Sequence, residues 1–455
     1  MNGTAQLAEF LSKTRYEDLP QPVIEGMKAL TLDWLGSALA GKAFYPSDLF
    51  RHYAKIMGPA SGSSTIFGEE QQTSPYFAAL INGASSHLLE QDDLHNSSVF
   101  HPATVVFPAI LAAGEDLNIS GKDFLLAAVM GYEAGIRIGE FLGRSHYQIF
   151  HTTSTVGSIS AAIAVGKLMQ FDQEQMLNLI GNAATQSAGV WAFLEDAADS
   201  KQLHTAKANA NGILAAYMTK EGLKGARNAL EGLQGLGRGM SQDSDAKYLS
   251  DRLGERWASI ETSFKYHASC RHTHPAGDAL LEIIEEHQLQ HQEITKIEAY
   301  VHQAAIDVLG PVTNPQTVHQ AKFSMGTVMG LLAVHRKAGL FEFSQYALTD
   351  HQVIAVREKV SMILDQEVDR AYPKEWQGKV VVMMNSGQRY ETFLRYPKGD
   401  PQNPLSPQEL ETKFKQLIRF SEDQNLLVKS DALISMIWRL EQLPVITELT
   451  ALLSE

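Results

Sequence analysis

The stretch "STVGSISAAIAVGKLMQ", residues 154–170, combines apolar residues at helical spacing with many Gly, Ala and Ser residues. Small side chains allow the backbones of neighbouring helices to approach closely. We therefore expect this stretch to form a helix inside a tightly packed helical bundle.

Three other segments share this character, namely residues 16–41, 121–143 and 204–232. The first of them carries apolar residues at helical spacing and ends at Gly41, where a helix would stop. Helical patterns continue to about residue 260. Helices from Ser406 onward could pack back on the same bundle.

The pattern changes in the last third of the chain. Residues 294–302 alternate apolar residues with polar or aromatic ones and predict a strand. Residues 379–394 predict a hairpin, because two β-rich runs flank an Asn-Ser-Gly turn. The segments between them, residues 323–339 and 351–364, have helical patterns.

These patterns together predict a mainly α fold with two domains. The larger domain is all-helical and is expected to comprise residues 1–264, joined by residues 405–455. The smaller domain is α+β and is expected to comprise residues 265–404.

Composition limits the function. The chain has 455 residues, of which 44% are hydrophobic and 20% charged, as in ordinary globular proteins. It shows neither a membrane-spanning run nor a signal pattern, so we expect a cytoplasmic protein. The single cysteine, Cys270, excludes an internal disulfide framework. The net charge of −14 argues against nucleic acid or an anionic membrane as partner. A small anionic substrate would therefore need a local pocket of Lys, Arg and His.

Groups that exchange protons are concentrated in "HLLEQDDLHNSSVFHPATVVFPAI", residues 87–110, which contains Glu90, Asp92, Asp93, His95 and His101. Such a group can form an acid–base site, because different environments separate the proton affinities of its members. The alternative is a solvated loop with helix-capping acids. The flanking residues predict the end of one helix and the start of an apolar one, so we expect the polar groups to face a cavity.

A metal site is the rival interpretation. Asp92, His95 and His101 could be ligands, and so could the three histidines of "KYHASCRHTHPAGDA", residues 265–279. Neither set has the spacing of an established zinc motif. We therefore predict no metal.

Three further groups of basic residues lie at segment junctions. His151 opens a helix rich in small residues, where the helix end favours a nearby anion. The other groups are Lys201 with His204, and Lys265 with Arg271 and His274. Each group is weak evidence alone, but together they supply the basic pocket that a polycarboxylate requires.

Five motifs in order resemble the MmgE/PrpD family, which includes 2-methylcitrate dehydratase, cis-aconitate decarboxylase and iminodisuccinate epimerase. The resemblance covers nearly the whole chain. The motifs are "EQDDLH…HPATVVFPAILAA" (90–113), "GYEAGIRIGEFLG" (131–143), "FHTTSTVGSISAAIAVGKLM" (150–169), "SKQLHTAKANANGILAAYMTKEGL" (200–223) and "KYHASCRHTHPAGDA" (265–279).

The resemblance implies a helical domain with a smaller α+β lid domain, a homodimer, and a pocket between the domains. It implies chemistry on a small di- or tricarboxylate without metal or organic cofactor. The family's acidic motif falls on residues 90–93. Its other functional positions fall on His101, His151, Lys201, His204, Lys265 and His274.

This chain departs from the family pattern at three positions. Glu90 replaces the usual Asp, Cys270 stands where the decarboxylases carry a catalytic histidine, and Thr327 stands where a tyrosine is common. The departures at Cys270 and Thr327 speak against 2-methylcitrate dehydratase and cis-aconitate decarboxylase as the specific activity. A lyase that dehydrates or decarboxylates remains the first interpretation, an epimerase is the alternative, and a non-catalytic polycarboxylate-binding protein is third.

We expect His101 and His151 to transfer protons and Asp93 or Glu90 to orient one of them or act as a base. Lysines in a water-poor cleft would neutralise the charge that develops beside the reacting carbon. Lys201, Lys265 and Arg271 are therefore expected to hold substrate carboxylates. The remaining candidates for substrate binding are His204, His274 and His95.

Overall fold

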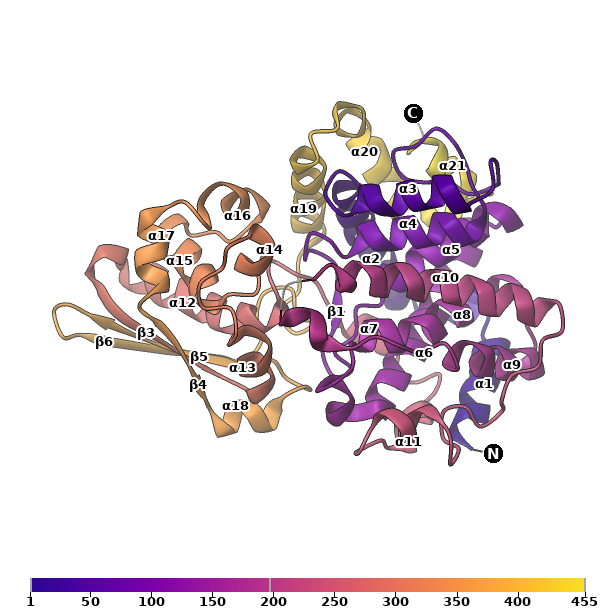
Figure 1. Ribbon diagram of the computed structural model, residues 1–455, viewed down its shortest axis with the longest axis horizontal. Coiled ribbons are helices and arrows are strands. Elements are labelled where there is room, and N and C mark those ends of the chain that lie inside the picture. Colours follow the sequence, from indigo (N-terminus) through magenta and orange to yellow (C-terminus); the bar gives the residue numbers. More distant parts are fainter. Residues whose placement is uncertain (1, 196–197, 454–455) are drawn as a thin grey trace.

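The computed structural model describes residues 2–195 and 198–453. A large bundle of helices lies beside a smaller domain in which helices pack on a sheet (Figure 1). The predicted fold class is thereby confirmed: the protein is mainly α, with a helical domain and a smaller α+β domain.

The helical domain brings together the first part of the chain and its C-terminal end. Helix α19 packs against α2, and α20 packs against both of them. A two-stranded pairing of β1 (Leu94–His95) with β2 (Thr262–Ser263) lies near the second domain. The helices are α1 (Gly3–Lys13), α2 (Gln21–Gly41), α3 (Ser47–Met57), α4 (Pro75–Ser86), α5 (Ala103–Leu117), α6 (Gly121–Tyr147), α7 (Thr152–Thr155), α8 (Gly157–Leu168), α9 (Gln173–Ala184), α10 (Ser200–Lys220), α11 (Leu236–Met240), α19 (Pro407–Phe420), α20 (Gln424–Trp438) and α21 (Thr447–Ala451).

Close helix packing follows from the small residues. Helix α8 is buried along almost its whole length, as predicted for residues 154–170. A Cβ atom added at Gly212 of α10 would lie 2.5 Å from the Cβ of Ala161 in α8, so a larger residue at position 212 would push these two helices apart.

The α+β domain is built on a four-stranded sheet of order β4-β3-β5-β6, in which β3 pairs parallel with β4 and antiparallel with β5. The predicted strand and hairpin are confirmed as β3 (Ile294–Val301), β5 (Gly378–Met384) and β6 (Arg389–Leu394). Helix α12 (His274–His287) packs against β5 and β6. The other elements are α13 (Gln303–Leu309), α14 (Val318–Ala321), α15 (Met325–His335), α16 (Leu340–Tyr346), α17 (His351–Arg357), β4 (Val360–Leu364) and α18 (Gln366–Ala371).

Two helical predictions are partly wrong. Residues 351–364 form a helix only as far as Arg357, because Val360–Leu364 pairs with β3 and becomes an edge strand. The helix predicted over 204–232 ends at Lys220. Gly222 follows with a φ of +94°, a conformation that stops a helix and that glycine adopts without strain.

Each domain has its own apolar core. The core of the helical domain extends from Leu7 to Ala258 and from Leu405 to Leu453, whereas that of the α+β domain lies mainly between Ala268 and Met384. The domain boundaries at residues 264 and 404 stay predictions. Within residues 2–195 and 198–453, no helix has both the length and the apolar character needed to cross a membrane. The cytoplasmic location stays a prediction.

Candidate active site

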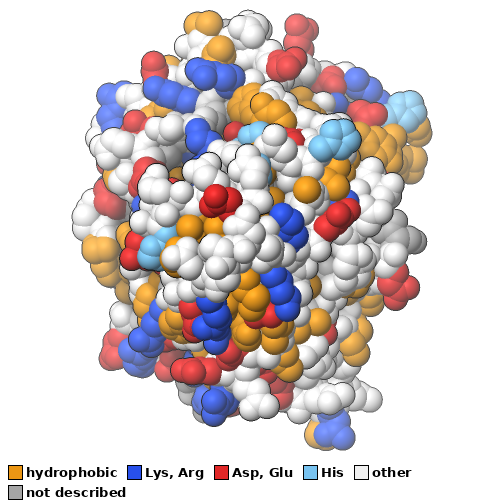
Figure 2. Space-filling model, turned by 90° about the vertical axis from the view of Figure 1, so that its left-hand side faces the viewer, with side chains coloured by type: hydrophobic (Ala, Val, Ile, Leu, Met, Phe, Trp, Pro, Cys, Tyr) orange, Lys and Arg blue, Asp and Glu red, His pale blue; other side chains and the backbone are white. Residues whose placement is uncertain are grey.

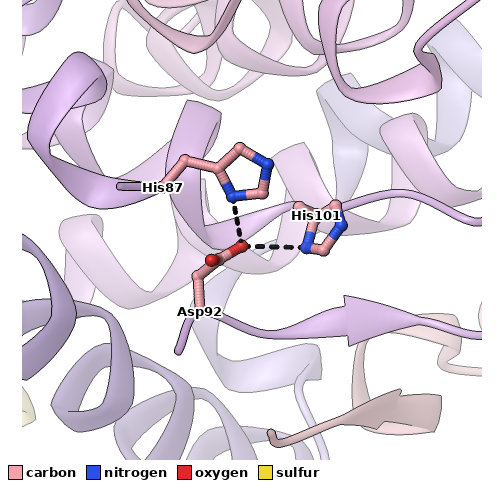
Figure 3. Close-up of side chains that lie close together, drawn as sticks. All are labelled: His87, Asp92 and His101. Atoms are coloured by element: carbon pink, nitrogen blue, oxygen red, sulfur yellow. Dashed lines mark hydrogen bonds and ion pairs between the residues drawn. The ribbon is translucent and has the colours of Figure 1, made fainter. Parts of the chain in front are cut away.

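The junction between α4 and α5 carries the central feature of the site. Asp92 is fully buried, and its Oδ2 atom lies 2.8 Å from Nδ1 of His87 and 2.8 Å from Nδ1 of His101 (Figure 3). Burial alone would raise the pKa of Asp92, but the two histidines and Lys265 hold it well below its usual range. Asp92 is therefore an ionised carboxylate that accepts hydrogen bonds from both imidazoles.

This arrangement fixes the proton on His101. Its Nδ1 also lies 2.6 Å from the backbone oxygen of Asp93, so both neighbours of Nδ1 are acceptors. We accordingly assign the proton to Nδ1, which leaves the lone pair on Nε2. Burial lowers the pKa of His101 despite the opposing charge of Asp92, so the ring is neutral in the free protein. A neutral imidazole with a free Nε2 can act as a base.

Lysines from both domains surround Glu90. Lys201 of α10 contacts Oε1, and Nζ of Lys265 lies 2.8 Å from Oε2. Burial opposes ionisation, but these lysines hold the pKa of Glu90 well below normal. A third buried lysine, Lys322, donates to the backbone oxygen of Leu89 at 2.9 Å. Burial lowers the pKa of Lys322 to about 8, so it is still mostly protonated at pH 7.

Lys201, Lys265 and Lys322 carry three positive charges, whereas Glu90 and Asp92 carry two negative charges. The cluster therefore has one more positive charge than negative. This surplus is local: on the surface of the α+β end, acidic and basic side chains are interspersed (Figure 2). An anion entering the cluster would meet cations and neutral imidazoles in a water-poor environment, where electrostatic attraction is strong.

His151 and His204 extend the cluster toward aromatic residues. Their Nδ1 atoms lie 3.1 Å apart, and burial lowers the pKa of both rings, to about 4 for His204. The ring of His151 lies 6.5 Å from that of His101 and 4.7 Å from Trp191. Its Nε2 atom is buried without a hydrogen-bond partner among the described residues. His151 can therefore offer a free ring nitrogen beside His101.

The carboxyl group of Asp93 contacts residues of α5 and α6. It accepts from the backbone N–H of Ala103 at 3.1 Å and from the hydroxyl of Tyr132 at 2.8 Å. Burial and the neighbouring charge of Asp92 raise its pKa well above normal. The carboxyl thus holds the start of α5 in place, and it is the backbone of Asp93 that contacts His101.

Arg271, His274 and His95 lie in other polar networks. Arg271 pairs with Asp400 at 3.4 Å and lies 3.3 Å from Nδ1 of His274. His95 contacts Ser98 at 2.8 Å and faces Glu261 at 3.7 Å. The structure gives these three candidates protein partners instead of bringing them to Glu90 and Asp92. Their role in substrate binding stays a prediction.

Of the three departures from the family pattern, Glu90 is part of the cluster and Cys270 lies close to it. Burial raises the pKa of the Cys270 thiol to about 11, so this side chain is not a thiolate nucleophile at neutral pH. The hydroxyl of Thr327 is buried and has no partner among the described residues. Both side chains are smaller than an imidazole or a phenol and leave more room at these positions.

Sequence reasoning did not select His87 or Lys322 as site residues. His87 opens the acid-rich stretch and directly follows α4, a position that could have drawn attention to it. Lys322 gave no such signal, because a lysine beside an apolar helix is usually a solvated residue.

Of the two groups among the described residues whose ligand atoms lie close enough to hold a metal ion, the one in the cluster is His87, Asp92 and His101. Two imidazoles and a carboxylate are a common ligand type. Here, however, both Nδ1 atoms lie 2.8 Å from one carboxylate oxygen, the distance of an N–H···O hydrogen bond. A metal needs unprotonated nitrogens at about 2.0–2.1 Å, so these side chains would have to rearrange.

The buried histidines predict acid sensitivity. Burial lowers the pKa of His87 and of His272 to about 3, against an ordinary value of about 6.5. Below pH 6.5 the unfolded chain binds a proton at each residue and the folded chain does not. The free energy of unfolding should therefore fall by about 1.4 kcal/mol per pH unit for each histidine as the pH drops from 6 to 4. Urea unfolding at several pH values measures this slope. In His272→Gln the slope should be smaller by the contribution of one histidine, about 1.4 kcal/mol per pH unit. A flat profile would contradict it.

These features define a class of protein: two domains that enclose a buried acid–base cluster suited to a small anion. The chain belongs to the MmgE/PrpD family. The family's N-terminal domain matches residues 5–249 and its C-terminal domain matches residues 267–433. The resemblance of the five motifs is thereby confirmed.

Relatives match over nearly the full length. The chain is 26% identical to the cis-aconitate decarboxylase-like protein oryM of Aspergillus oryzae over 482 residues, covering 100% of this chain and 97% of the relative. It is 25% identical to a cis-aconitate decarboxylase of Aspergillus terreus, covering 98% and 95%. It is also 25% identical to the cis-aconitate decarboxylase of Homo sapiens, covering 90% and 87%.

Proposed function

We propose that this protein is a cofactor-independent lyase that decarboxylates an unsaturated tricarboxylate resembling cis-aconitate. The observation that carries the proposal is the Asp92–His101 pair beside a surplus of lysine charge. The names of the full-length relatives support decarboxylation over dehydration.

In the proposed reaction, the bond between one carboxyl carbon and its neighbour breaks, and carbon dioxide leaves. The electron pair passes through the adjacent double bond toward a second carboxylate. Lys201 and Lys265 neutralise the negative charge that develops there. They remain shared with Glu90, which keeps both ammonium groups in place.

His101 supplies the proton that replaces carbon dioxide. The anionic substrate raises the proton affinity of the ring, and Asp92 stabilises the resulting imidazolium through Nδ1. Nε2–H then transfers its proton to carbon, which leaves the ring neutral, and the ring takes up its next proton from water when another substrate molecule binds. His151 lies on a second side of this position and is our candidate for the other proton-transfer group.

Dehydration would use the same residues differently: Nε2 of His101 would remove a proton next to a carboxylate, a double bond would form, and the β-hydroxyl would leave as water after taking a proton from the site. An epimerase would return that proton on the opposite face, a role that His151 could serve. The relatives' names give no support to the epimerase.

A substrate panel tests the proposal. Purified protein treated with a chelator is incubated with cis-aconitate, methylcitrate and both stereoisomers of iminodisuccinate, and substrate loss and carbon dioxide release are measured. We expect equal amounts of both from cis-aconitate and neither with His101→Ala. Loss of methylcitrate without carbon dioxide would favour a dehydratase, and saturable binding without turnover would favour a binding protein.

The homodimer is part of the proposal and has its own support. Leu49, Tyr53 and Ile56 of α3 are 51%, 46% and 65% exposed, and their spacing places them along one side of the helix. Leu214 and Met218 of α10 are also exposed. Both helices pack against α4 on the same side of the domain (Figure 1). Apolar side chains gathered in this way suit an interface between two copies.

We expect light scattering to give twice the 50.1 kDa mass of the chain. The double variant L49E/I56E should give the monomer mass, because charged side chains would be buried at the interface. Val428→Glu, at an 86% exposed position on α20, is the matched control and should stay dimeric. A monomeric wild type contradicts the proposed interface.

A further inference from the structure

The tautomer of a second buried histidine can be read from a chain of hydrogen bonds. His302 caps α13: the backbone N–H of Ala305 donates to its Nδ1 atom at 3.2 Å. Because Nδ1 accepts, the proton of the neutral ring is on Nε2. That Nε2 atom lies 3.5 Å from Nδ1 of His272. His302 therefore donates to His272, and the proton of His272 is on its own Nε2.

His272 is held firmly in this orientation. Its ring stacks on Trp376 with centroids 4.8 Å apart and an interplanar angle of 20°. The ring of His302 stacks on Tyr372 at 3.9 Å. His272 is only 2% exposed, and Nε2 is buried with no partner among the described residues. A buried N–H without an acceptor lowers the stability of the folded protein. We therefore expect this donor to form a hydrogen bond with a bound molecule.

His272 lies beside the candidate active site, because Trp376, on which its ring stacks, packs with Leu94 and Val99 of the stretch between Asp93 and His101. Burial lowers the pKa of His272, and the positive charges of Lys265 and Lys201 are close enough to lower it further. Its ring lies 6.3 Å from Tyr147, which is 5.0 Å from Trp191, which in turn is 4.7 Å from His151. The aromatic rings therefore connect His272 to the proton-transfer side of the cluster.

We propose that His272 is a neutral hydrogen-bond donor to a carboxylate of the bound substrate, and that His302 is a positioning residue that fixes its tautomer. This inference rests on the proposed function and adds a residue to it. His101 and His272 are both neutral in the free protein, but they present opposite functions at Nε2: a lone pair on His101 and an N–H on His272. No proton leaves His272, because a neutral imidazole is a donor and a very weak acid.

Variants of His272 test the contact. The glutamine amide places an N–H near the position of Nε2, whereas alanine removes the donor. The probe is tricarballylate, a saturated tricarboxylate, and its Kd is measured by calorimetry. We expect His272→Ala to raise the Kd by about 10- to 100-fold, the loss of one hydrogen bond to a charged group. His272→Gln should stay within about threefold of the wild type.

His302→Asn tests the tautomer. Asparagine can keep the cap on α13 but has no Nε2 donor, so a purely structural role for His302 would be rescued. We expect a KM about tenfold higher with kcat little changed, because the contact that is lost binds a substrate carboxylate, and we expect the pH profile to stay the same, because His272 does not titrate in the cycle. Nitrogen NMR of histidine-labelled protein, with His272→Gln for assignment, should find the proton on Nε2 of His272.

The two proposals fail in different ways. If the wild type turns over no polycarboxylate, the proposed function fails, while the Kd values and the tautomer still test this inference. If the wild type is active but His272→Ala binds and reacts like it, or if the proton lies on Nδ1, the inference is wrong and the proposed function stands.

Discussion

Asp92→Asn should lower kcat by about 10²–10⁴-fold with little change in the fold. The carboxylate accepts from Nδ1 of both His87 and His101, and in the proposed reaction it stabilises the imidazolium that donates to carbon. Next to Lys265, the oxygen of an asparagine would turn toward the ammonium group, and its NH₂ would face the two imidazoles. These would then carry their protons on Nε2, and His101 would lose its basic nitrogen.

The matched control is Asp350→Asn. Asp350 accepts from Nε2 of His335 at 2.9 Å, an Asp–His pair in the α+β domain that is not part of the cluster. Steady-state kinetics should find the control within about threefold of the wild type. Near-ultraviolet circular dichroism checks that both variants keep the fold of the wild type. Equal kinetics for the two variants would refute the role of Asp92.

Lys265→Met should affect both stability and activity. Removing Lys265 weakens a buried ion-pair network, because Glu90 would keep only Lys201 and Asp92 would lose a cation 3.9 Å away. We expect the free energy of unfolding to fall by about 3–5 kcal/mol. The kcat should fall by about 10²-fold or more, because a group that neutralises the developing charge is lost.

A second substitution separates the two effects. In Glu90→Gln/Lys265→Met the cluster regains the surplus of one positive charge that it has in the wild type, so part of the stability should return but the activity should not. Lys13→Met breaks an exposed pair with Glu9 and should cost less than about 1 kcal/mol. Recovery of activity in the double variant would show that Lys265 acts only by balancing Glu90.

Helical periodicity predicted the domain organisation because most of the chain forms amphipathic or fully buried helices. It failed at Val360–Leu364, where a short apolar run continues the helical pattern of α17. The strand there depends on pairing with β3, which is distant in the sequence. Local pattern contains no information on such a partner.

The site was predictable to the level of the segment but not of the side chain. From the sequence, Asp93 or Glu90 is expected to orient a histidine. In the structure it is Asp92 that faces two imidazoles, whereas the Asp93 carboxyl anchors α5. That difference depends on backbone direction at the α4–α5 junction. Arg271 was predicted to face the substrate because it is basic and close to Lys265 in sequence. In the fold it pairs with Asp400.

Proton NMR of the protein with cis-aconitate in deuterium oxide tests the central claim most directly. The account predicts that cis-aconitate is replaced by an unsaturated dicarboxylate that carries one deuterium on carbon, and that Asp92→Asn and His101→Ala slow this conversion strongly. Deuterium entering cis-aconitate without loss of carbon dioxide, or saturable binding with no reaction, would contradict it.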